Sequence, residues 1–60
     1  MKEFIVRYHR KGHIRRFTRF VTSECVTQVI SDWEEHESES AIDDPNYEIC
    51  LIDAVYEKVV

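Results

Sequence analysis

The sequence has few of the residues that build tight loops, crosslinks and membrane spans. Its 60 residues include one glycine, Gly12, one proline, Pro45, and two cysteines, Cys25 and Cys50. A single glycine leaves no glycine-rich loop to cradle a phosphate. Two cysteines do not make a disulfide scaffold, and no apolar run approaches the roughly 18 residues of a membrane span. The first residues contain no apolar signal-peptide core, so we expect a cytoplasmic protein with reduced thiols.

The short chain also narrows the classes of function. A domain of this length buries about 60% of the surface of its extended chain and forms one thin core. A catalytic cleft usually needs a pocket of about 300 Å³ or more, walled on several sides. We therefore expect a single domain, residues 1–60, that binds a partner, is not an enzyme and has no catalytic residue.

Alternating residues predict three strands. Residues 4–9 alternate at strand spacing, and residues 14–21 are rich in aromatic and β-branched side chains. Between them, Gly12 can take the positive φ that a tight hairpin turn requires. A third strand is predicted in residues 47–59, where the apolar run from Ile49 to Ile52 suits a central strand.

A helix is predicted between the second and third strands. Ser23 can cap its first amides, and an apolar stripe at helical spacing follows, made of Cys25, Val26, Val29, Ile30 and Trp33. Glu37 would occupy the continuation of this stripe, so we expect the helix to run from about residue 24 to about residue 38.

The order of these elements predicts an α+β fold, β-β-α-β, with a three-stranded antiparallel sheet in order 2-1-3 and one helix packed on one face. Two hairpin registers are possible. An odd-length loop places Ile14 and Phe20 on the same face as Phe4, Val6 and Tyr8, whereas a two-residue turn places Phe17 and Val21 there. We favour the first, because its inward set is more apolar at the strand ends. Large aromatic residues are expected in the core, namely Phe4, Tyr8, Trp33 and Tyr56.

Charge is divided unevenly along the chain. Residues 1–20 carry seven Lys or Arg and one acid, and residues 21–60 carry eleven acids and one Lys, which gives the formal net charge of −4. Such asymmetry suggests two surfaces with different partners, or head-to-tail association of two copies. The oligomeric state stays open.

The acidic surface is the first candidate for a binding site. Residues 32–44 hold seven acids and no Lys or Arg: Asp32, Glu34, Glu35, Glu37, Glu39, Asp43 and Asp44. A dense acidic ridge can imitate a phosphate backbone and occupy a basic groove of an enzyme that acts on nucleic acid. The alternative is a solvated face that keeps a small protein in solution.

The basic hairpin is the second candidate. Arginines would grip phosphates and an aromatic ring would stack a base of single-stranded RNA or DNA, using Arg7, Arg10, Lys11, Arg15, Phe17 and Arg19. Against this hypothesis, the net negative charge opposes approach to a polyanion, and the arginines can instead pair with acids on neighbouring strands.

No metal or cofactor is expected. His9, His13, Cys25, His36 and Cys50 are suitable ligand types, but they lack the spacing of a zinc site. Both cysteines lie in apolar patterns, where a free cysteine behaves as a small hydrophobe.

Two stretches carry a family resemblance. The sequence "FTRFVT", Phe17 to Thr22, which leads into the helix, and "ICLID", Ile49 to Asp53, in the last strand resemble the corresponding stretches of Dmd-type phage antitoxins. These small proteins inhibit RNase toxins of the RnlA/LsoA kind. The resemblance implies a small phage-encoded inhibitor in the cytoplasm of an infected bacterium. Its partner would be a host protein that processes nucleic acid, with no membrane partner.

Overall fold

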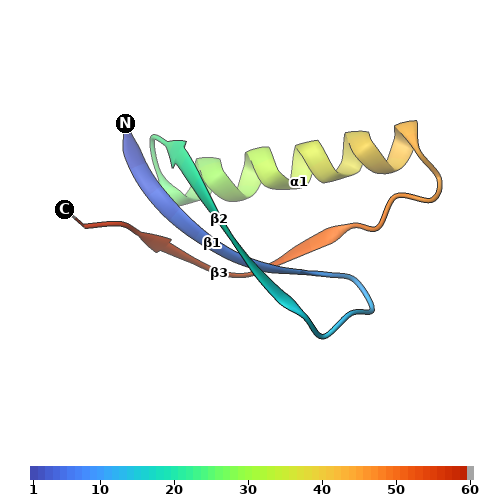
Figure 1. Ribbon diagram of the computed structural model, residues 1–60. Helices are drawn as coiled ribbons and strands as arrows, with labels where there is room; N and C mark the ends of the chain where they lie inside the picture. Colours follow the sequence, from blue (N-terminus) through green and yellow to red (C-terminus); the bar gives the residue numbers. More distant parts are fainter. Residues whose placement is uncertain (60) are drawn as a thin grey trace.

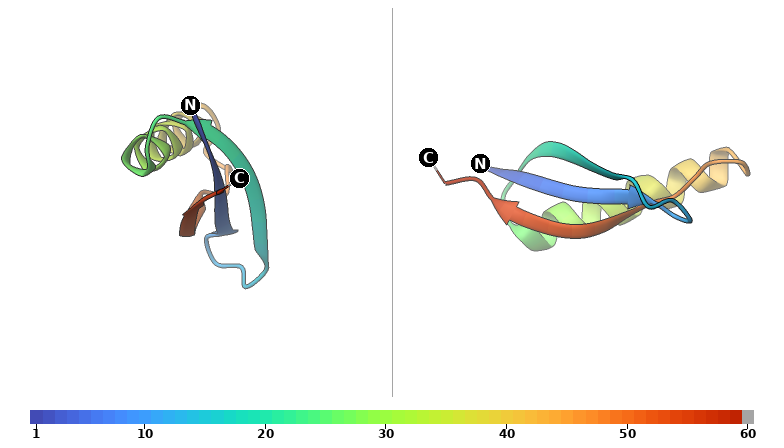
Figure 2. Two further views of the ribbon diagram at one scale, coloured as in Figure 1. Left: turned by 90° about the vertical axis from the view of Figure 1, so that its left-hand side faces the viewer. Right: turned by 60° about the horizontal axis from the view of Figure 1, so that its bottom comes forward.

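The computed structural model describes residues 1–59 and has the predicted β-β-α-β fold. Its elements are β1 (Lys2–Arg10), β2 (Arg16–Ser23), α1 (Val26–Asp43) and β3 (Cys50–Glu57). The strands form one antiparallel sheet in order β2-β1-β3, as expected. The helix crosses one face of this twisted sheet (Figure 1). Seen along the helix, the sheet is curved and α1 lies on its concave side (Figure 2).

The favoured hairpin register is wrong. Phe4 pairs with Val21, and Tyr8 pairs with Phe17, so Val21 and Phe17 share the helix-covered face with β1 residues of even number. The loop between β1 and β2 is longer than a two-residue turn. It begins with a turn in which the His13 amide donates to the Arg10 carbonyl oxygen at 2.9 Å and Gly12 has a φ of 84°. Because Ile14 then lies in the loop, it cannot fill an inward strand position.

The core is small and lies between the middle of β1 and the helix. It consists of Phe4 and Val6 from β1 with Val29 and Trp33 from α1. Tyr8 packs at its border, whereas Tyr56 is 54% exposed, so the expectation of a buried Tyr56 is wrong. Tyr56 pairs with Ile5, and this pairing directs both side chains to the uncovered face.

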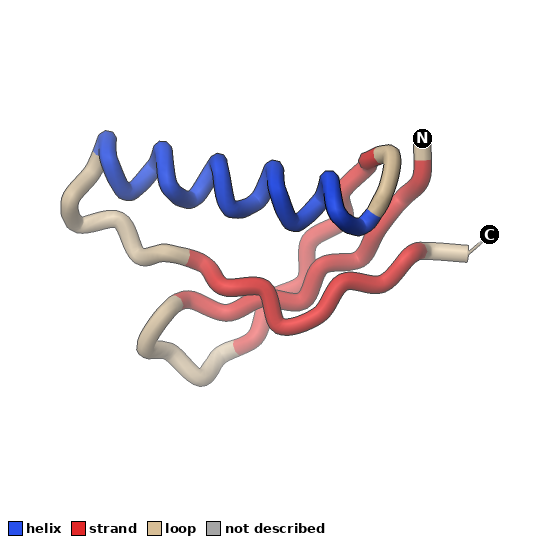
Figure 3. Tube along the Cα trace, turned by 180° about the vertical axis from the view of Figure 1, so that it is seen from behind, coloured by secondary structure: helices blue, strands red, loops and turns tan. Residues whose placement is uncertain are grey.

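The helix begins and ends later than predicted. Cys25 occupies the position before the first helical residue and is exposed, so neither a Ser23 cap nor a buried Cys25 is found. At the other end, the Asp44 amide donates to the Ser40 carbonyl oxygen at 3.0 Å, and Pro45 follows. The residue before a proline disfavours helical geometry, which explains why α1 ends there. The connections at both ends of the helix are visible in Figure 3.

The third strand is an edge strand, although its apolar middle suits a central one. β3 pairs with β1 and leaves its other side open among the described residues. The register shifts between Arg7 and Tyr8, which pair with Ala54 and Ile52, so Asp53 is an extra residue in a bulge. The central-strand expectation fails because the helix shields the first part of this edge.

Truncation of the two Phe residues of the hairpin tests its register. Phe4→Ala should lower the free energy of unfolding by about 3–5 kcal/mol, because Phe4 is buried in the core. Phe20→Ala should cost less than about 1 kcal/mol, because Phe20 lies on the uncovered face. Urea denaturation followed by circular dichroism measures both. If Phe4→Ala does not fold, Phe4→Leu against Phe20→Leu gives the same comparison. Equal losses would contradict the register.

Candidate functional site

The junction between α1 and β3 positions the rest of the acidic helix. Trp33 Nε1 donates a hydrogen bond to the Cys50 carbonyl oxygen at 3.1 Å. The Cys50 amide in turn donates to Glu37 Oε2 at 3.2 Å. Two side chains one helical turn apart therefore satisfy both outward backbone groups at the start of β3. Glu37 is 6% exposed, so this predicted surface residue is a structural carboxylate.

The Glu37 carboxylate also raises the pKa of two neighbouring side chains, Tyr47 and Cys50. A hydrogen bond from the Tyr47 hydroxyl to Glu37 raises the pKa of Tyr47 to about 12, with a further contribution from partial burial. Burial, together with the negative charge of Glu37, raises the pKa of the Cys50 thiol. A thiol with a raised pKa is a poor nucleophile at neutral pH.

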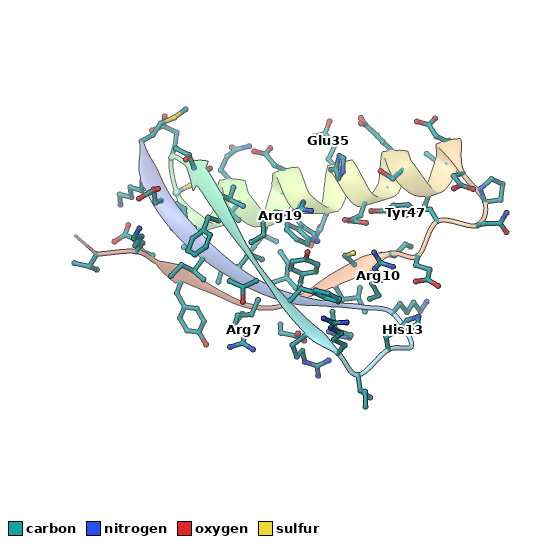
Figure 4. The ribbon with its side chains drawn as sticks, in the orientation of Figure 1. Arg7, Arg10, His13, Arg19, Glu35 and Tyr47 are labelled. Carbon is teal, nitrogen blue, oxygen red and sulfur yellow. The ribbon has the colours of Figure 1, made fainter. Side chains whose placement is uncertain are left out.

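Four of the predicted acidic residues form one row on α1. They are exposed and follow one another at spacings of three or four residues, so they lie on one side of the helix: Asp32, Glu35, Glu39 and Asp43. We call this row the acidic stripe. Glu35 points away from the sheet in Figure 4. Gln28 supports the first residue of the stripe by donating to Asp32 Oδ1 at 2.6 Å.

The remaining predicted acids do not join the stripe. Glu34 is exposed on the side of α1 that faces the edge of β3. Asp44 follows the helix, and its Oδ1 accepts a hydrogen bond from the Asn46 amide at 3.0 Å. The predicted ridge is thus separated into a helical row and three residues in other environments, because helical periodicity distributes neighbours in sequence around the helix.

The basic hairpin does not form a single surface. Arg7 lies on the uncovered face of the sheet and Arg19 lies between the sheet and α1 (Figure 4). Several cations are paired: Arg10 lies 3.5 Å from Glu48, and Arg16 Nε lies 3.1 Å from Asp53. Within the described residues, the cations outside ion pairs are Arg7, Lys11, Arg15 and Arg19.

Two of these unpaired arginines stack on aromatic rings of the helix-covered face. Arg15 lies over the Phe17 ring at 5.2 Å, and Arg19 lies 5.6 Å from Tyr8 and 5.4 Å from Trp33. Phe17 and Tyr8 are themselves stacked, with their centroids 5.6 Å apart. We call these five residues the cation–aromatic ladder. A guanidinium over an aromatic face is attracted by the ring electrons, which explains why Arg19 is tolerated beside the core.

A small polar pocket of about 150 Å³ adjoins the ladder. Arg10, Arg19 and His36 line it together with Glu37 and Tyr47. Four residues of the predicted basic set, Arg10, Arg15, Phe17 and Arg19, are therefore found near one another. Lys11 lies in the hairpin loop, and Arg7 is on the opposite face of the sheet.

The uncovered face of the sheet carries an apolar row that the sequence analysis missed. Ile5 pairs with Phe20 on one side and with Tyr56 on the other. Both aromatic residues are exposed, and Lys58 Nζ lies 5.9 Å from the Phe20 ring centroid. Only the correct hairpin register would have revealed this row from the sequence, and the alternation of residues left two registers open.

The predicted metal-ligand types are dispersed. His9 Nδ1 lies 2.8 Å from Asp53 Oδ1, without the alignment of a hydrogen bond, and His13 Nε2 lies 3.4 Å from Glu48. Across residues 1–59, no three His, Cys, Asp or Glu side chains gather in a way that could hold a metal ion. In the same range, no helix has the length and apolarity needed to cross a membrane.

Comparison of the chain with protein-family models, with curated proteins and with solved structures gives no match. The candidate surfaces therefore have to be judged by their own geometry and charge.

Replacing Glu37 with Gln tests the junction. Glu37→Gln removes the negative charge, so the pKa of Tyr47 should fall from about 12 toward its ordinary value of 10.0. Because the folded-state pKa is the higher one, the contribution of Tyr47 to stability is complete below pH 10.0 and is lost as pH rises through about 12. In the variant this loss should still begin near pH 10.0, but it should be smaller and should be complete at lower pH, because the folded-state pKa is lower. Titration of the Tyr47 ring signals by NMR measures the pKa, and Glu34→Gln is the matched control. An unchanged Tyr47 pKa in Glu37→Gln would contradict the contact.

Proposed function

We propose that this protein is a small non-enzymatic inhibitor that binds and blocks a nucleic-acid-processing enzyme of a bacterial host, an RNase toxin, a nuclease or a CRISPR-type effector. The acidic stripe enters the basic groove through which that enzyme binds RNA or DNA. Inhibition is steric, because the stripe occupies the position of the phosphate backbone, and it requires no catalytic residue, metal or cofactor. The complex forms in the cytoplasm of the infected bacterium.

The observation that carries this proposal is the electrostatic cost of the stripe to the free protein. Glu35, Glu39 and Asp43 are four residues apart, and like charges at this spacing destabilise a helix by about 0.2–0.5 kcal/mol per pair. Asp43 also lies in the last turn, where the helix dipole favours cations, and α1 has no basic residue in that turn. Cations of a partner would relieve both costs.

The position of the stripe supports the same mechanism. The stripe lies on an 18-residue helix, which presents its acids in one straight row. At 1.5 Å per residue, successive levels from Glu35 to Asp43 are about 6 Å apart along the axis. A regular row of negative charge is also what a nucleic-acid strand offers to a basic groove. Such complementarity speeds encounter with the groove and suppresses wrong partners.

The first experiment identifies the partner. The protein is used to capture binding proteins from two portions of a bacterial lysate, one untreated and one treated with nuclease, and mass spectrometry identifies the captured proteins. The captured enzyme is then assayed on RNA and DNA substrates with increasing amounts of the protein. Stoichiometric inhibition that is competitive with nucleic acid supports the proposal. A catch that disappears after nuclease treatment would overturn it.

Reversing the last acid of the stripe should improve stability and weaken inhibition. Asp43→Lys replaces a like-charge pair by a Glu39–Lys pair and favours the helix dipole, so the free energy of unfolding should rise by about 0.5–1 kcal/mol. The association rate with the captured enzyme should fall about threefold or more at low salt, with a smaller effect at high salt. Thermal unfolding and surface plasmon resonance measure the two quantities.

The matched control is Glu24→Lys, which changes the net charge equally at an exposed position outside the stripe. Its association rate should stay close to that of the unmodified protein. An equal fall in both variants would mean that net charge, and not the stripe, governs binding.

A second candidate function is binding of single-stranded RNA or DNA, and the cation–aromatic ladder favours it. Arg15 and Arg19 are unpaired and adjoin the stacked rings of Phe17 and Tyr8. Aromatic rings beside cations are the usual platform for unstacked bases and their phosphates. Glu37 lines the pocket beside the ladder, and the chain has a net charge of −4. Both repel phosphates, so we rank this function second.

Fluorescence anisotropy with a labelled oligouridine tests this second function at low salt. If the ladder binds RNA, Arg15→Ala combined with Arg19→Ala should reduce the affinity by about tenfold or more. Arg7→Ala is the control, because Arg7 is unpaired on the opposite face. Absence of binding by the unmodified protein, or equal loss in the control, would end this hypothesis.

A further inference from the structure

A groove of about 540 Å³ lies between α1 and the outer edge of β3. The helix contributes Ile30, Trp33 and Glu34, and the strand side contributes residues 49–52. Ile30 remains 37% exposed, so apolar surface of the helix stays open to solvent along the groove. Its volume is in the range of binding pockets, which is about 300–1,000 Å³.

The strand at the base of this groove has backbone groups available for pairing. In an antiparallel ladder, alternate residues direct both their N–H and C=O groups away from the neighbouring strand. At Cys50 these outward groups are taken by Glu37 and Trp33. Two residues further, Ile52 occupies the same kind of position, and β3 has no second neighbour among the described strands. The helix therefore closes the edge at Cys50 and leaves it open from Ile52 onward.

We propose that this groove binds an extended segment of a partner protein, which adds to β3 as a fourth strand. Main-chain hydrogen bonds to Ile52 supply part of the affinity, and apolar side chains at alternate positions enter the groove. A Lys or Arg of the segment lies against Glu34. The groove is on the opposite side of α1 from the acidic stripe, so this inference goes beyond the proposed function and does not depend on it.

Charge selects the occupant. Among the described residues that line the groove, Glu34 is the exposed charged residue, because Glu37 is buried against the Cys50 amide, and none is Lys, Arg or His. The groove therefore complements a segment that carries positive charge. A second copy of the chain is a poor occupant. Pairing of two β3 edges would place two α1 helices side by side, and residues 26–43 contain six acids and no Lys or Arg. Repulsion between the two helices opposes this arrangement.

The test uses the full chain labelled with ¹⁵N and a capped heptapeptide of sequence Lys-Thr-Val-Thr-Val-Thr-Lys, in which both Val and both Lys lie on one face of the extended strand. Saturable changes in NMR chemical shift are expected at the amides of Ile52, Leu51, Ile30 and Glu34. A peptide with Glu in place of both Lys should bind at least about fivefold more weakly. A peptide with N-methyl groups on the backbone that faces β3 should not bind, because it cannot donate to the strand.

Two variants of the same kind complete the test. Ile30→Asn should weaken binding of the Lys-containing peptide by about tenfold or more, because it places a polar group in the apolar part of the groove without changing the charge. Ile42→Asn is the control, since Ile42 is 81% exposed on another side of α1. Thermal unfolding confirms that both variants are folded.

Three results would overturn the inference. One is the absence of shifts up to about 1 mM peptide, which corresponds to the weakest binding of interest. The second is a set of shifts centred on Phe20, Ile5 and Tyr56 of the uncovered face. The third is binding that survives N-methylation, which would show apolar adsorption without strand pairing. None of these results bears on Asp43→Lys, so failure of this inference is distinguishable from failure of the proposed function.

Discussion

Two hydrogen bonds between side chains of α1 and the backbone of Cys50 hold the helix in place over the sheet. A three-stranded sheet with one helix has an open edge on each side, and such an edge exposes backbone donors and acceptors. Trp33 donates to the carbonyl oxygen of one edge residue, Cys50, at 3.1 Å, and Glu37 accepts from the amide of the same residue at 3.2 Å. These hydrogen bonds fix the height and rotation of the helix above β3. The direction of the acidic stripe follows, because every other side chain of α1 turns with Trp33 and Glu37.

The same contact explains why the faces of this small protein differ so strongly in character. With Trp33 and Glu37 turned toward the sheet, the acidic stripe faces outward, and Glu34 with Ile30 faces the edge of β3. The cation–aromatic ladder lies on the sheet side, where Arg19 covers the rings of Tyr8 and Trp33. One thin core thus supports an acidic, a cationic and an apolar surface. Each surface would suit a partner of different chemistry.

Hairpin register accounts for most of what the sequence analysis missed. Alternation in residues 14–21 fits either parity, since Phe17, Phe20 and Val21 are all good strand residues. The wrong parity exchanged Phe17 with Phe20 between the two faces. With the wrong parity, neither the row of Phe20, Ile5 and Tyr56 nor the stacking of Phe17 on Tyr8 could be predicted. The buried Glu37 was missed for another reason: a carboxylate in the continuation of an apolar stripe is usually solvated, unless backbone donors meet it.

The sequence alone determined the order of the elements, the strand order and the separation of charge between the two halves of the chain. Periods of two and of 3.6 residues, with turns at Gly12 and Pro45, are local properties, and the chain carries them before it folds. Only the tertiary structure decided which acids form a common surface and which become structural. Asp32 and Glu37 are both acidic residues of the same helix, but Asp32 is exposed on the acidic stripe and Glu37 binds the Cys50 amide. That difference depends on a hydrogen bond across 13 residues of chain, which no local pattern encodes.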